Sequence, residues 1–280
     1  MSQPLVSVLM LTFNRPQLLD RAIESVRSQD LESWELIVVH DGPNQEIRRI
    51  LENWVSRDSR VRYFHREQPG NIAEATNFGI ARARGEFIAI LDDDDRWACP
   101  DKLSRQVAFL RRNPSYAGCG GGVIVVDEWG RESMRYQKPE FDAAIRRHAL
   151  IANPAAHSTM MYRKTALDAC GGYDESLPGF QDWDLWLRML QIGKLYNFPD
   201  YFLEYTIWEG GGSFFQRRKN TRSALRIVWR HRRTYPRFLP ALLLALSYHA
   251  YAHLPNVLTR STFPMLSRLK KALFSASSRS

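Results

Sequence analysis

Four consecutive aspartates, Asp92 to Asp95, follow the apolar part of the segment EFIAILD (residues 86–92). Like charges this close together repel one another, so without a counter-charge some of these carboxyls should stay protonated. A divalent cation removes the repulsion, and carboxylate oxygens are suitable ligands for Mg²⁺ or Mn²⁺. Taken alone, the quartet is explained equally well by a solvated acidic turn, or by Asp95 acting as the cap of a following helix.

Asp182 and Asp184 lie in the segment GFQDWDLWLRML, where Asp182 begins a series with the spacing of one helix face that continues with Leu185, Trp186 and Met189. An acidic side chain at a helix N-terminus is favoured by the helix dipole whether or not it has a chemical role. The same position would hold a general base on a rigid support. The residues alone leave both interpretations open.

The first hundred residues alternate between strand-like and helix-like patterns. Strands are predicted over 5–13, 34–40, 61–65 and 86–92, and helices from Pro16 and over 46–55 and 73–83. This order is typical of an α/β fold with a parallel sheet covered by helices on both faces. Ligands bind at the carboxyl ends of the strands in such sheets. The predicted ends carry Thr12 to Arg15, Asp41 and the aspartate quartet, although Asp41 alone, before a glycine, is more typical of a turn.

The pattern is looser after Pro100. We expect a helix over 101–112, a glycine run from Gly118 to Gly122 that leads into a strand over 123–127, and a loop-rich segment over 128–156. A further strand is predicted over 157–163 and a further helix over 181–192. Gly210 to Gly212 are interpreted as the loop that ends this part of the chain.

Charge divides the chain into two parts. Its formal net charge is +9, but residues 217–280 contain 14 Lys and Arg and no Asp or Glu. The division predicts a body over 1–216 and a basic, partly apolar helical tail over 217–280, with helices over 222–233 and 265–274 and an apolar stretch over 238–254. Such a tail suits docking on an anionic membrane surface, or it is a helical extension packed on the body. Nucleic acid is not an expected partner because no such motif is present.

Composition excludes several classes of protein. Apolar residues make up 44% of the chain and charged residues 25%, which is typical of a folded protein and not of a disordered one. The three cysteines, which form no CxxC pair, argue against a disulfide framework or a zinc site and favour a cytoplasmic protein. We find no secretory signal, and no apolar run is long enough for a confident membrane span.

Four segments, taken in order, resemble the family 2 glycosyltransferases, which are inverting enzymes with the GT-A nucleotide-diphospho-sugar transferase fold. They are VSVLMLTFNRPQLLDRAIESVRSQ, WELIVVHDG, ATNFGIARARGEFIAILDDDD and GFQDWDLWLRM, and the resemblance covers about residues 4–215. It implies an α/β fold with a mostly parallel central sheet flanked by helices. The tail lies outside the resemblance.

The resemblance also implies roles for individual residues. Asp182 matches the catalytic base of the family. The DxD motif would be Asp92-Asp93-Asp94, with Asp94 the direct ligand of Mn²⁺ or Mg²⁺ and Asp92 or Asp93 reaching the ribose or the metal; Asp93-Asp94-Asp95 is an alternative register. The nucleotide-sugar would also be contacted by Thr12, Asn14, Arg15, Asp41 and Asn77, with Asp41 bound to the base, typically uracil.

Departures from the family pattern keep alternatives open. Gln181 stands where a glutamate is frequent, and Thr76 where an arginine is frequent, so a degenerate protein that binds a nucleotide-sugar without transfer is the second hypothesis. The second strand ends in His40-Asp41-Gly42, where Asp-Asp-Gly is usual. An aspartyl-phosphate phosphatase is disfavoured because Arg96 follows the quartet, and a nucleotidylyltransferase because the first loop, 12–16, lacks glycine.

The expected function is metal-dependent, inverting transfer of one sugar from a nucleotide-diphosphate donor, a UDP-sugar, to a glycan or lipid-linked acceptor in surface polysaccharide biosynthesis. Transfer of a single sugar is expected because the Gln-x-x-Arg-Trp signature of processive synthases is absent near Gln216. Asp182 would deprotonate the acceptor hydroxyl, and a single displacement would invert the anomeric configuration.

Overall fold

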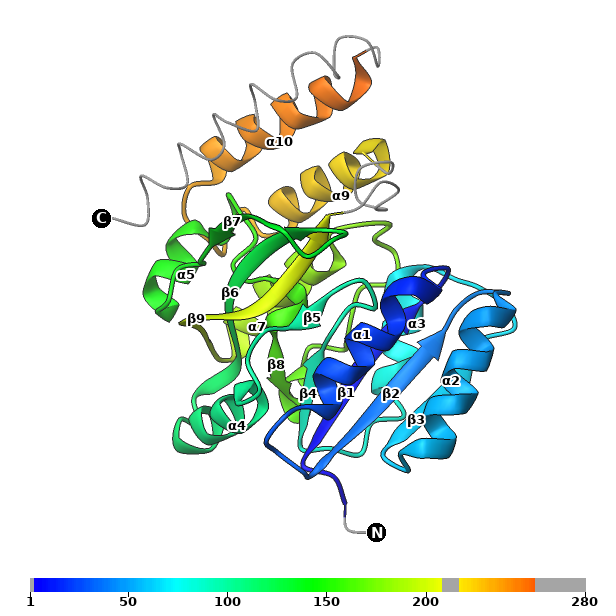
Figure 1. Cartoon of the computed structure of the whole chain (residues 1–280). Helices are drawn as coiled ribbons and strands as arrows, with labels where there is room; N and C mark the ends of the chain where they lie inside the picture. The colour runs from blue at the N-terminus through cyan, green and yellow to red at the C-terminus, as the bar shows by residue number, and fades with distance from the viewer. Residues whose placement is uncertain (1–2, 208–216, 255–280) are drawn as a thin grey trace.

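A computed structural model describes residues 3–207 and 217–254 (Figure 1). Strands and helices alternate through the first hundred residues and become less regular beyond them. The elements in chain order are β1 (Val6–Thr12), α1 (Pro16–Arg27), β2 (Trp34–His40), α2 (Gln45–Arg57), β3 (Val61–His65), α3 (Ile72–Ile80), β4 (Phe87–Ile90), β5 (Arg96–Trp97), α4 (Lys102–Arg112), β6 (Tyr116–Asp127), β7 (Glu132–Tyr136), α5 (Asp142–His148), the 3₁₀ turn η1 (His157–Thr159), β8 (Met161–Arg163), α6 (Lys164–Ala169), α7 (Gln181–Ile192), β9 (Lys194–Ile207), α9 (Arg217–Arg230) and α10 (Phe238–His253).

The described strands form one mixed sheet in the order β3-β2-β1-β4-β8-β6-β9-β5, with β7 added on β6. β1, β2, β3 and β4 pair in parallel, so their carboxyl ends meet at one edge. β8 is antiparallel to both of its neighbours, β4 and β6, which makes β6 parallel to β4. An α/β fold with a parallel half is therefore confirmed, and the second half of the sheet is mixed.

Two layers of helices cover the sheet. On one face, the apolar sides of α1, α2 and α4 pack on strand residues such as Val8, Leu36 and Phe87. On the other face, α3, α5, α6 and α7 pack on residues such as Ile37 and Ile88. Helix starts follow local chemistry, because Pro16 occupies the first turn of α1 and the Asn44 side chain accepts hydrogen bonds from two backbone N–H groups of α2.

The strands and helices predicted from a clear apolar period are confirmed, with bounds close to those predicted. The bounds of β2, β3 and α7 coincide with the predicted segments, and β1, α1, α2, α3, β4 and α4 differ from them by a few residues. The strand predicted over 123–127 is present, but β6 begins at Tyr116, so the glycine run over 118–122 lies inside the strand and not before it. A Cβ on Gly118 would come within 2.8 Å of the Tyr162 ring, and one on Gly121 within 2.5 Å of the Phe202 ring, so the glycines permit close packing within the strand.

Three elements beyond Pro100 differ from the prediction. The segment 128–156, expected to be loop-rich, contains β7 and α5. The segment 157–163, expected to be one strand, divides into η1 and the short β8. β9 was not predicted, because Pro199 interrupts its pattern, and the register of its pairing with β6 shifts around Gly122.

The C-terminal helices pack on the body. Ala224, Ile227 and Val228 of α9 and Ala241 and Ala245 of α10 belong to the core cluster that includes α7. Figure 1 shows α10 lying beside α9 on the outside of the molecule. No helix in the described ranges combines the length and hydropathy that a membrane span requires. The predicted loop at 210–212 and helix at 265–274 lie outside the described residues.

Candidate active site

The predicted site residues of the first half come together at one edge of the sheet. β1 ends at Thr12, β2 ends one residue before Asp41, and β4 ends just before the aspartate quartet. Because β8 is antiparallel to β4, with Met161 opposite Ala89, the residues that precede β8 also arrive at this edge. Topology thus adds η1, with His157 and Ser158, to the groups that the sequence singled out.

The four aspartates alternate in their surroundings. The side chains of Asp92 and Asp94 are 38% and 17% exposed, whereas those of Asp93 and Asp95 are buried. Asp92 and Asp94 are therefore the pair that can reach a ligand from the edge of the sheet. The geometry favours the register Asp92-x-Asp94 over Asp93-x-Asp95.

Two arginines of the α1 region approach the quartet. The guanidinium of Arg15 lies 2.5 Å from Asp93 Oδ1 and also pairs with Asp94. Arg21 donates a hydrogen bond to the backbone carbonyl of Asp94 at 3.0 Å. Burial, with repulsion from Asp94 and Asp92, nevertheless outweighs Arg15 and raises the pKa of Asp93 to about 7. The negative charge of the quartet is only partly compensated.

Ser158 holds the quartet from the side of η1. Its hydroxyl oxygen lies 2.7 Å from Asp95 Oδ2 and 3.0 Å from Asp92 Oδ2. The other carboxylate oxygen of Asp95 accepts a hydrogen bond from the backbone N–H of Thr206 in β9. Asp95 therefore joins β4, η1 and β9, which is a structural role, while the same hydroxyl orients Asp92.

His157 lies between the quartet and α7. Its Nδ1 is 3.5 Å from Asp92 Oδ2, and its Nε2 is 2.9 Å from the Tyr173 hydroxyl. Burial alone would lower the pKa of His157, but the charges of Asp92 and Asp182 raise it above its ordinary value. Burial likewise opposes ionisation of Asp92, yet His157, Ser158 and Arg15 hold its pKa below the usual range.

Asp182 occupies the first turn of α7 at the same site. Its Oδ1 accepts a hydrogen bond from the backbone N–H of Trp183 at 2.8 Å. Burial, together with the charge of Asp92, raises the pKa of Asp182, and His157 opposes this rise. A carboxylate whose pKa is raised is a better proton acceptor, which is what a general base requires.

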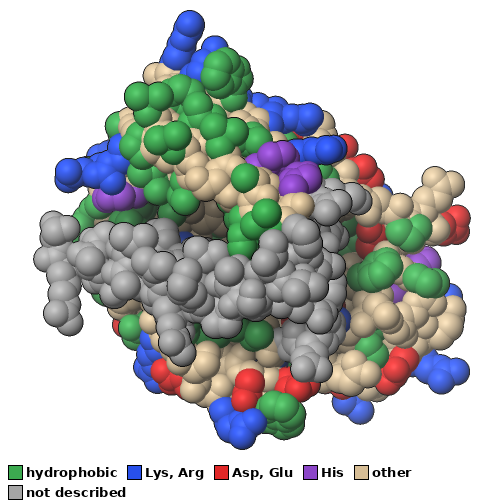
Figure 2. All heavy atoms as spheres, turned by 90° about the horizontal axis from the view of Figure 1, so that it is seen from above, with side chains coloured by type: hydrophobic (Ala, Val, Ile, Leu, Met, Phe, Trp, Pro, Cys, Tyr) green, Lys and Arg blue, Asp and Glu red, His purple; other side chains and the backbone are tan. Residues whose placement is uncertain are grey.

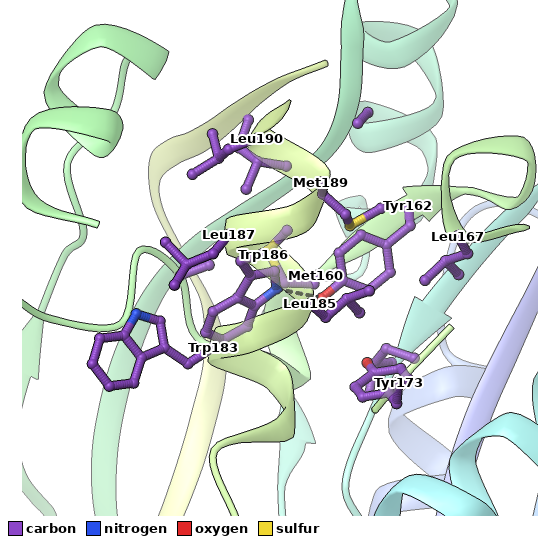
Figure 3. Close-up of a cluster of buried hydrophobic side chains, with 14 of the residues drawn as sticks. Met160, Tyr162, Leu167, Tyr173, Trp183, Leu185, Trp186, Leu187, Met189 and Leu190 are labelled. Atoms are coloured by element: carbon purple, nitrogen blue, oxygen red, sulfur yellow. Dashed lines mark hydrogen bonds between the residues drawn. The ribbon is translucent and has the colours of Figure 1, made fainter. Parts of the chain in front are cut away.

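The helix behind Asp182 is firmly anchored. Figure 3 shows α7 packed by its large apolar side chains, with the Trp186 indole N–H donating to the Tyr162 hydroxyl at 2.6 Å. The Trp183 indole donates to the carbonyl of Ala149 at 2.7 Å. These contacts fix the first turn of α7, so Asp182 is presented on a rigid support.

Asp41 forms a second group at the same edge. It is nearly buried at the end of β2, where its backbone N–H donates to the carbonyl of Thr12. Oδ2 accepts from the backbone N–H of Gly70 at 3.2 Å, and Oδ1 lies 3.2 Å from the guanidinium of Arg66. Burial raises the pKa of Asp41 in spite of these contacts.

Two other predicted residues contact protein groups. Asn14 is exposed, and its carbonyl oxygen accepts a hydrogen bond from the Asn44 amide at 2.6 Å. The Asn77 side-chain amide donates hydrogen bonds to the backbone carbonyl of Tyr173 and to the Glu175 carboxylate, and its oxygen accepts one from the backbone N–H of Tyr173. Asn77 therefore holds the segment that leads to α7. A contact of Asn77 with a nucleotide-sugar stays a prediction.

The sequence interpretation did not find His157, Ser158 or Arg66. The first two precede a three-residue strand whose antiparallel direction no pattern indicates. Arg66 follows β3 directly, and the rule of strand ends could have singled it out.

The quartet suits a divalent cation in one particular way. In the described part of the chain, no three His, Cys, Asp or Glu side chains are grouped so that they could hold a metal ion. Mg²⁺, however, is commonly bound by one or two carboxylates together with phosphate oxygens of a ligand. Asp92 and Asp94 are the members of the quartet with exposed carboxylate surface, which that mode requires. The residues therefore fit a cation that arrives with a phosphate ligand.

Comparisons with known proteins agree with this geometry. The family model "Glycosyl transferase family 2" matches residues 7–171. EpsE, a putative glycosyltransferase of Bacillus subtilis, is 31% identical over 77% of this chain and 77% of its own. The amylovoran biosynthesis glycosyltransferase AmsE of Erwinia amylovora is 28% identical over 71% of this chain and 74% of its own.

Solved structures show the same fold. Residues 1–349 of TarS from S. aureus, in complex with UDP-GlcNAc, align with a TM-score of 0.66 at 18% identity, over 87% of this chain and 72% of that one. The mannosyltransferase PcManGT from Pyrobaculum calidifontis, in complex with GDP-Man and Mn²⁺, aligns with a TM-score of 0.63 at 16% identity, over 96% of this chain and 81% of that one.

Proposed function

The chain belongs to glycosyltransferase family 2, and from this premise we propose that it is a metal-dependent, inverting enzyme. It transfers one sugar from a nucleoside diphosphate donor, a UDP-sugar, to the hydroxyl of a glycan or lipid-linked acceptor. The observation that carries the proposal is that Asp182, with its raised pKa, shares one edge of the sheet with the open pair Asp92 and Asp94. A base and a diphosphate site are thereby brought together.

The donor is bound along the ends of β1, β2 and β4. Asp41 and Thr12 lie at the end that would take the nucleobase, with Asn14 beside them on the exposed side. Arg15, between them and the quartet, supplies positive charge for the diphosphate. TarS was solved with UDP-GlcNAc and PcManGT with GDP-Man, which supports a nucleoside diphosphate sugar as the donor class.

A divalent cation is the proposed cofactor, held by Asp94 with Asp92. PcManGT was solved with Mn²⁺, which supports this choice of cofactor. When bound, the cation offsets the charge that develops on the diphosphate leaving group. Arg15 and Ser158 then keep the carboxylates in position, because each contacts one member of the pair directly.

The transfer is a single displacement. Asp182 accepts the proton of the acceptor hydroxyl while that oxygen forms a bond to the anomeric carbon. The bond from the anomeric carbon to the diphosphate oxygen breaks on the opposite face, and the nucleoside diphosphate leaves with the bonding electron pair. The product therefore carries the inverted anomeric configuration, and Asp182 ends the step protonated.

The acceptor belongs to surface polysaccharide biosynthesis, a class supported by AmsE, which is named for amylovoran biosynthesis. We place the enzyme in the cytoplasm, at the inner face of the membrane, where a nucleotide-sugar donor and a lipid-linked acceptor can meet. Residues 217–280 are the proposed membrane-docking unit, and residues 1–216 are the proposed catalytic unit.

The test measures donor turnover across a panel of sugar nucleotides in the presence of Mn²⁺, Mg²⁺ or EDTA. The quantity measured is the release of nucleoside diphosphate. We expect one donor to be turned over only with a metal, and Asp94→Ala to abolish both turnover and the metal-dependent thermal shift. Asp168→Asn, an exposed aspartate on α6, is the matched control and should change nothing. Turnover that EDTA leaves intact would contradict the metal dependence.

The second candidate function is binding of a nucleotide-sugar without transfer, which Gln181 and Thr76 keep open. In that case a donor would raise the melting temperature while Asp182→Asn changed no rate. Product with an inverted anomeric centre, formed by the wild type and lost in Asp182→Asn, would exclude this candidate.

A further inference from the structure

Helix α10 is packed with its small residues inward and its large apolar residues outward. Ala241, Ala245 and Ala252 are buried, whereas Leu239 is 68% exposed and Leu243 65% exposed. The alanines Ala241 and Ala245 lie in the core cluster that includes α9. A helix at the surface of a water-soluble domain normally shows the reverse arrangement, with its larger apolar residues in the core.

The exposed leucines form a continuous stripe. Leu239, Leu243 and Leu246 are spaced i, i+4 and i+7, so they lie on one face of the helix. Trp229 of α9, which is 56% exposed, lies against Phe238 at the start of α10, with ring centroids 6.0 Å apart. The apolar surface therefore extends from α10 onto the end of α9.

Positive charge surrounds this apolar surface. Residues 217–254 contain nine Lys and Arg and no Asp or Glu. The Arg232 guanidinium stacks over the Trp229 ring at 4.5 Å, and Arg233 and Arg237 are exposed in the connection to α10. Figure 2, which looks down on the end of the molecule that carries α10, shows hydrophobic side chains beside Lys, Arg and His side chains.

We infer that α10 and Trp229 dock on an anionic lipid surface, with the leucine stripe inserted among the lipid chains and the arginines at the headgroups. Exposed leucines, an exposed tryptophan and a basic segment with no Asp or Glu of its own are features of helices that lie in a membrane interface. A second copy of the chain is a poorer occupant, since it would bring two acid-free basic segments together. The inference deepens the proposed location, and only its consequence for the acceptor rests on the proposed transfer.

The docking surface is tied directly to the helix that carries the candidate base. Arg230 of α9 binds Asp174 at 2.7 Å and Asp184 of α7 at 2.8 Å. Tyr235, in the connection to α10, donates a hydrogen bond to the carbonyl of Leu187 in α7. A membrane bound by α10 would therefore have a fixed orientation relative to Asp182, which suits an acceptor that is itself held in the bilayer.

The first test is flotation of the full chain with vesicles of phosphatidylcholine or of an equimolar mixture of phosphatidylcholine and phosphatidylglycerol. We expect binding to the anionic vesicles, and at least about tenfold weaker partition for the triple variant Leu239→Gln/Leu243→Gln/Leu246→Gln, because three apolar side chains lose their insertion energy. Val55→Gln/Ile192→Gln removes exposed apolar residues of the body and is the matched control, expected to float as the wild type does.

The second test separates charge from insertion. Arg222→Gln/Arg233→Gln should weaken binding by about fivefold for each arginine and reduce its dependence on salt, since each cation near an anionic surface contributes a similar increment. Arg57→Gln/Arg112→Gln removes the same charge from exposed positions of the body and should have no such effect. Donor-dependent thermal shift, measured on every variant, should stay unchanged, so failure of docking is distinguishable from failure of the donor site.

Three results would overturn the inference. If the wild type stays unbound to both kinds of vesicle, docking is rejected. Equal flotation of the wild type and the triple leucine variant would mean that another surface binds. A dimer in solution that the leucine variant disperses, without flotation of either protein, would assign the stripe to contacts between copies.

Discussion

Two aspartates on α7, two positions apart, have opposite surroundings. Asp184 is fully buried, and its carboxylate is held by Arg188 at 2.7 Å, Arg230 at 2.8 Å and His231 at 3.3 Å. Although burial opposes ionisation, these partners lower the pKa of Asp184 to about 2. For Asp182, burial prevails and the pKa is raised.

The difference distinguishes an acid that holds the fold from one that can take part in chemistry. The carboxylate of Asp184 is surrounded by cations from two helices, so it joins α9 to α7 and takes up a proton only in strong acid. Asp182 faces the edge of the sheet, where the nearby charges are Asp92 and His157. The same residue type on the same helix therefore serves stability on one side and, we propose, proton transfer on the other.

The aspartate quartet repeats this contrast on a smaller scale. Asp95 is buried and bound by Ser158 and by the backbone of Thr206, whereas Asp92 and Asp94 remain open to the edge. The quartet forms a turn closed by the hydrogen bond from the Asp95 backbone N–H to the Asp92 carbonyl, and within this turn Asp93 and Asp95 are the buried side chains.

The largest effect is expected from Asp182→Asn. An amide cannot accept the proton of the acceptor hydroxyl, so turnover should fall by at least about 10³-fold. The melting temperature and the donor-induced thermal shift should stay close to those of the wild type. The measurement is the rate of glycosylated product formation beside thermal unfolding of the same preparations.

The same substitution at Asp184 should lower the stability of the protein and leave its turnover largely intact. Asp184→Asn leaves Arg188, Arg230 and His231 without their shared anion, and the free energy of unfolding should fall by about 3 kcal/mol. Turnover per folded molecule should be largely retained. Denaturant titration and activity below the melting temperature test both statements. An inactive but fully stable Asp184→Asn protein would reverse the roles that we assign to the two aspartates.

Acid should weaken the Asp184 contact in a defined range of pH. The folded-state pKa of about 2 lies below the ordinary 3.8, so the stabilisation is complete above about pH 4 and is lost as the pH falls toward 2. The shift corresponds to about 2 kcal/mol. The difference in unfolding free energy between the wild type and Asp184→Asn should therefore narrow as the pH falls below about 4. A difference that does not change with pH would contradict the lowered pKa.

A feature of the fold or of the candidate site can be predicted from the sequence when the residues that determine it lie close together in the chain. The sheet edge and Asp182 follow from short-range patterns, since apolar periodicity placed β2, β3 and α7 correctly. Arg188, four residues after Asp184, is the one partner of Asp184 that lies nearby in the sequence, whereas Arg230 and His231 follow Asp184 by 46 and 47 residues. Their contacts depend on how α9 packs on α7, which no local pattern encodes.

The mixed half of the sheet also could not be predicted from local sequence patterns. β8 has three residues, too few for a period, and its antiparallel direction is set by its neighbours β4 and β6. His157 and Ser158 reach the site only because of that direction. The glycines of β6 were placed before the predicted strand and not inside it, because their role, close packing against Tyr162 and Phe202, depends on distant parts of the chain.

The smallest expected effect, from Ser158→Ala, tests whether structural and chemical acids can be separated within the quartet. The hydroxyl contacts both Asp95 and Asp92, so its removal leaves the buried Asp95 with one partner fewer and should cost about 1 kcal/mol of unfolding free energy. Because Asp92 is the more exposed of the two, it can be hydrated in place of the lost contact, and donor binding should weaken only several-fold. Calorimetric titration with the donor, alongside denaturant unfolding, measures both quantities. Loss of all donor binding with unchanged stability would mean that Ser158 serves the open pair alone, and that Asp95 is held by β9 without it.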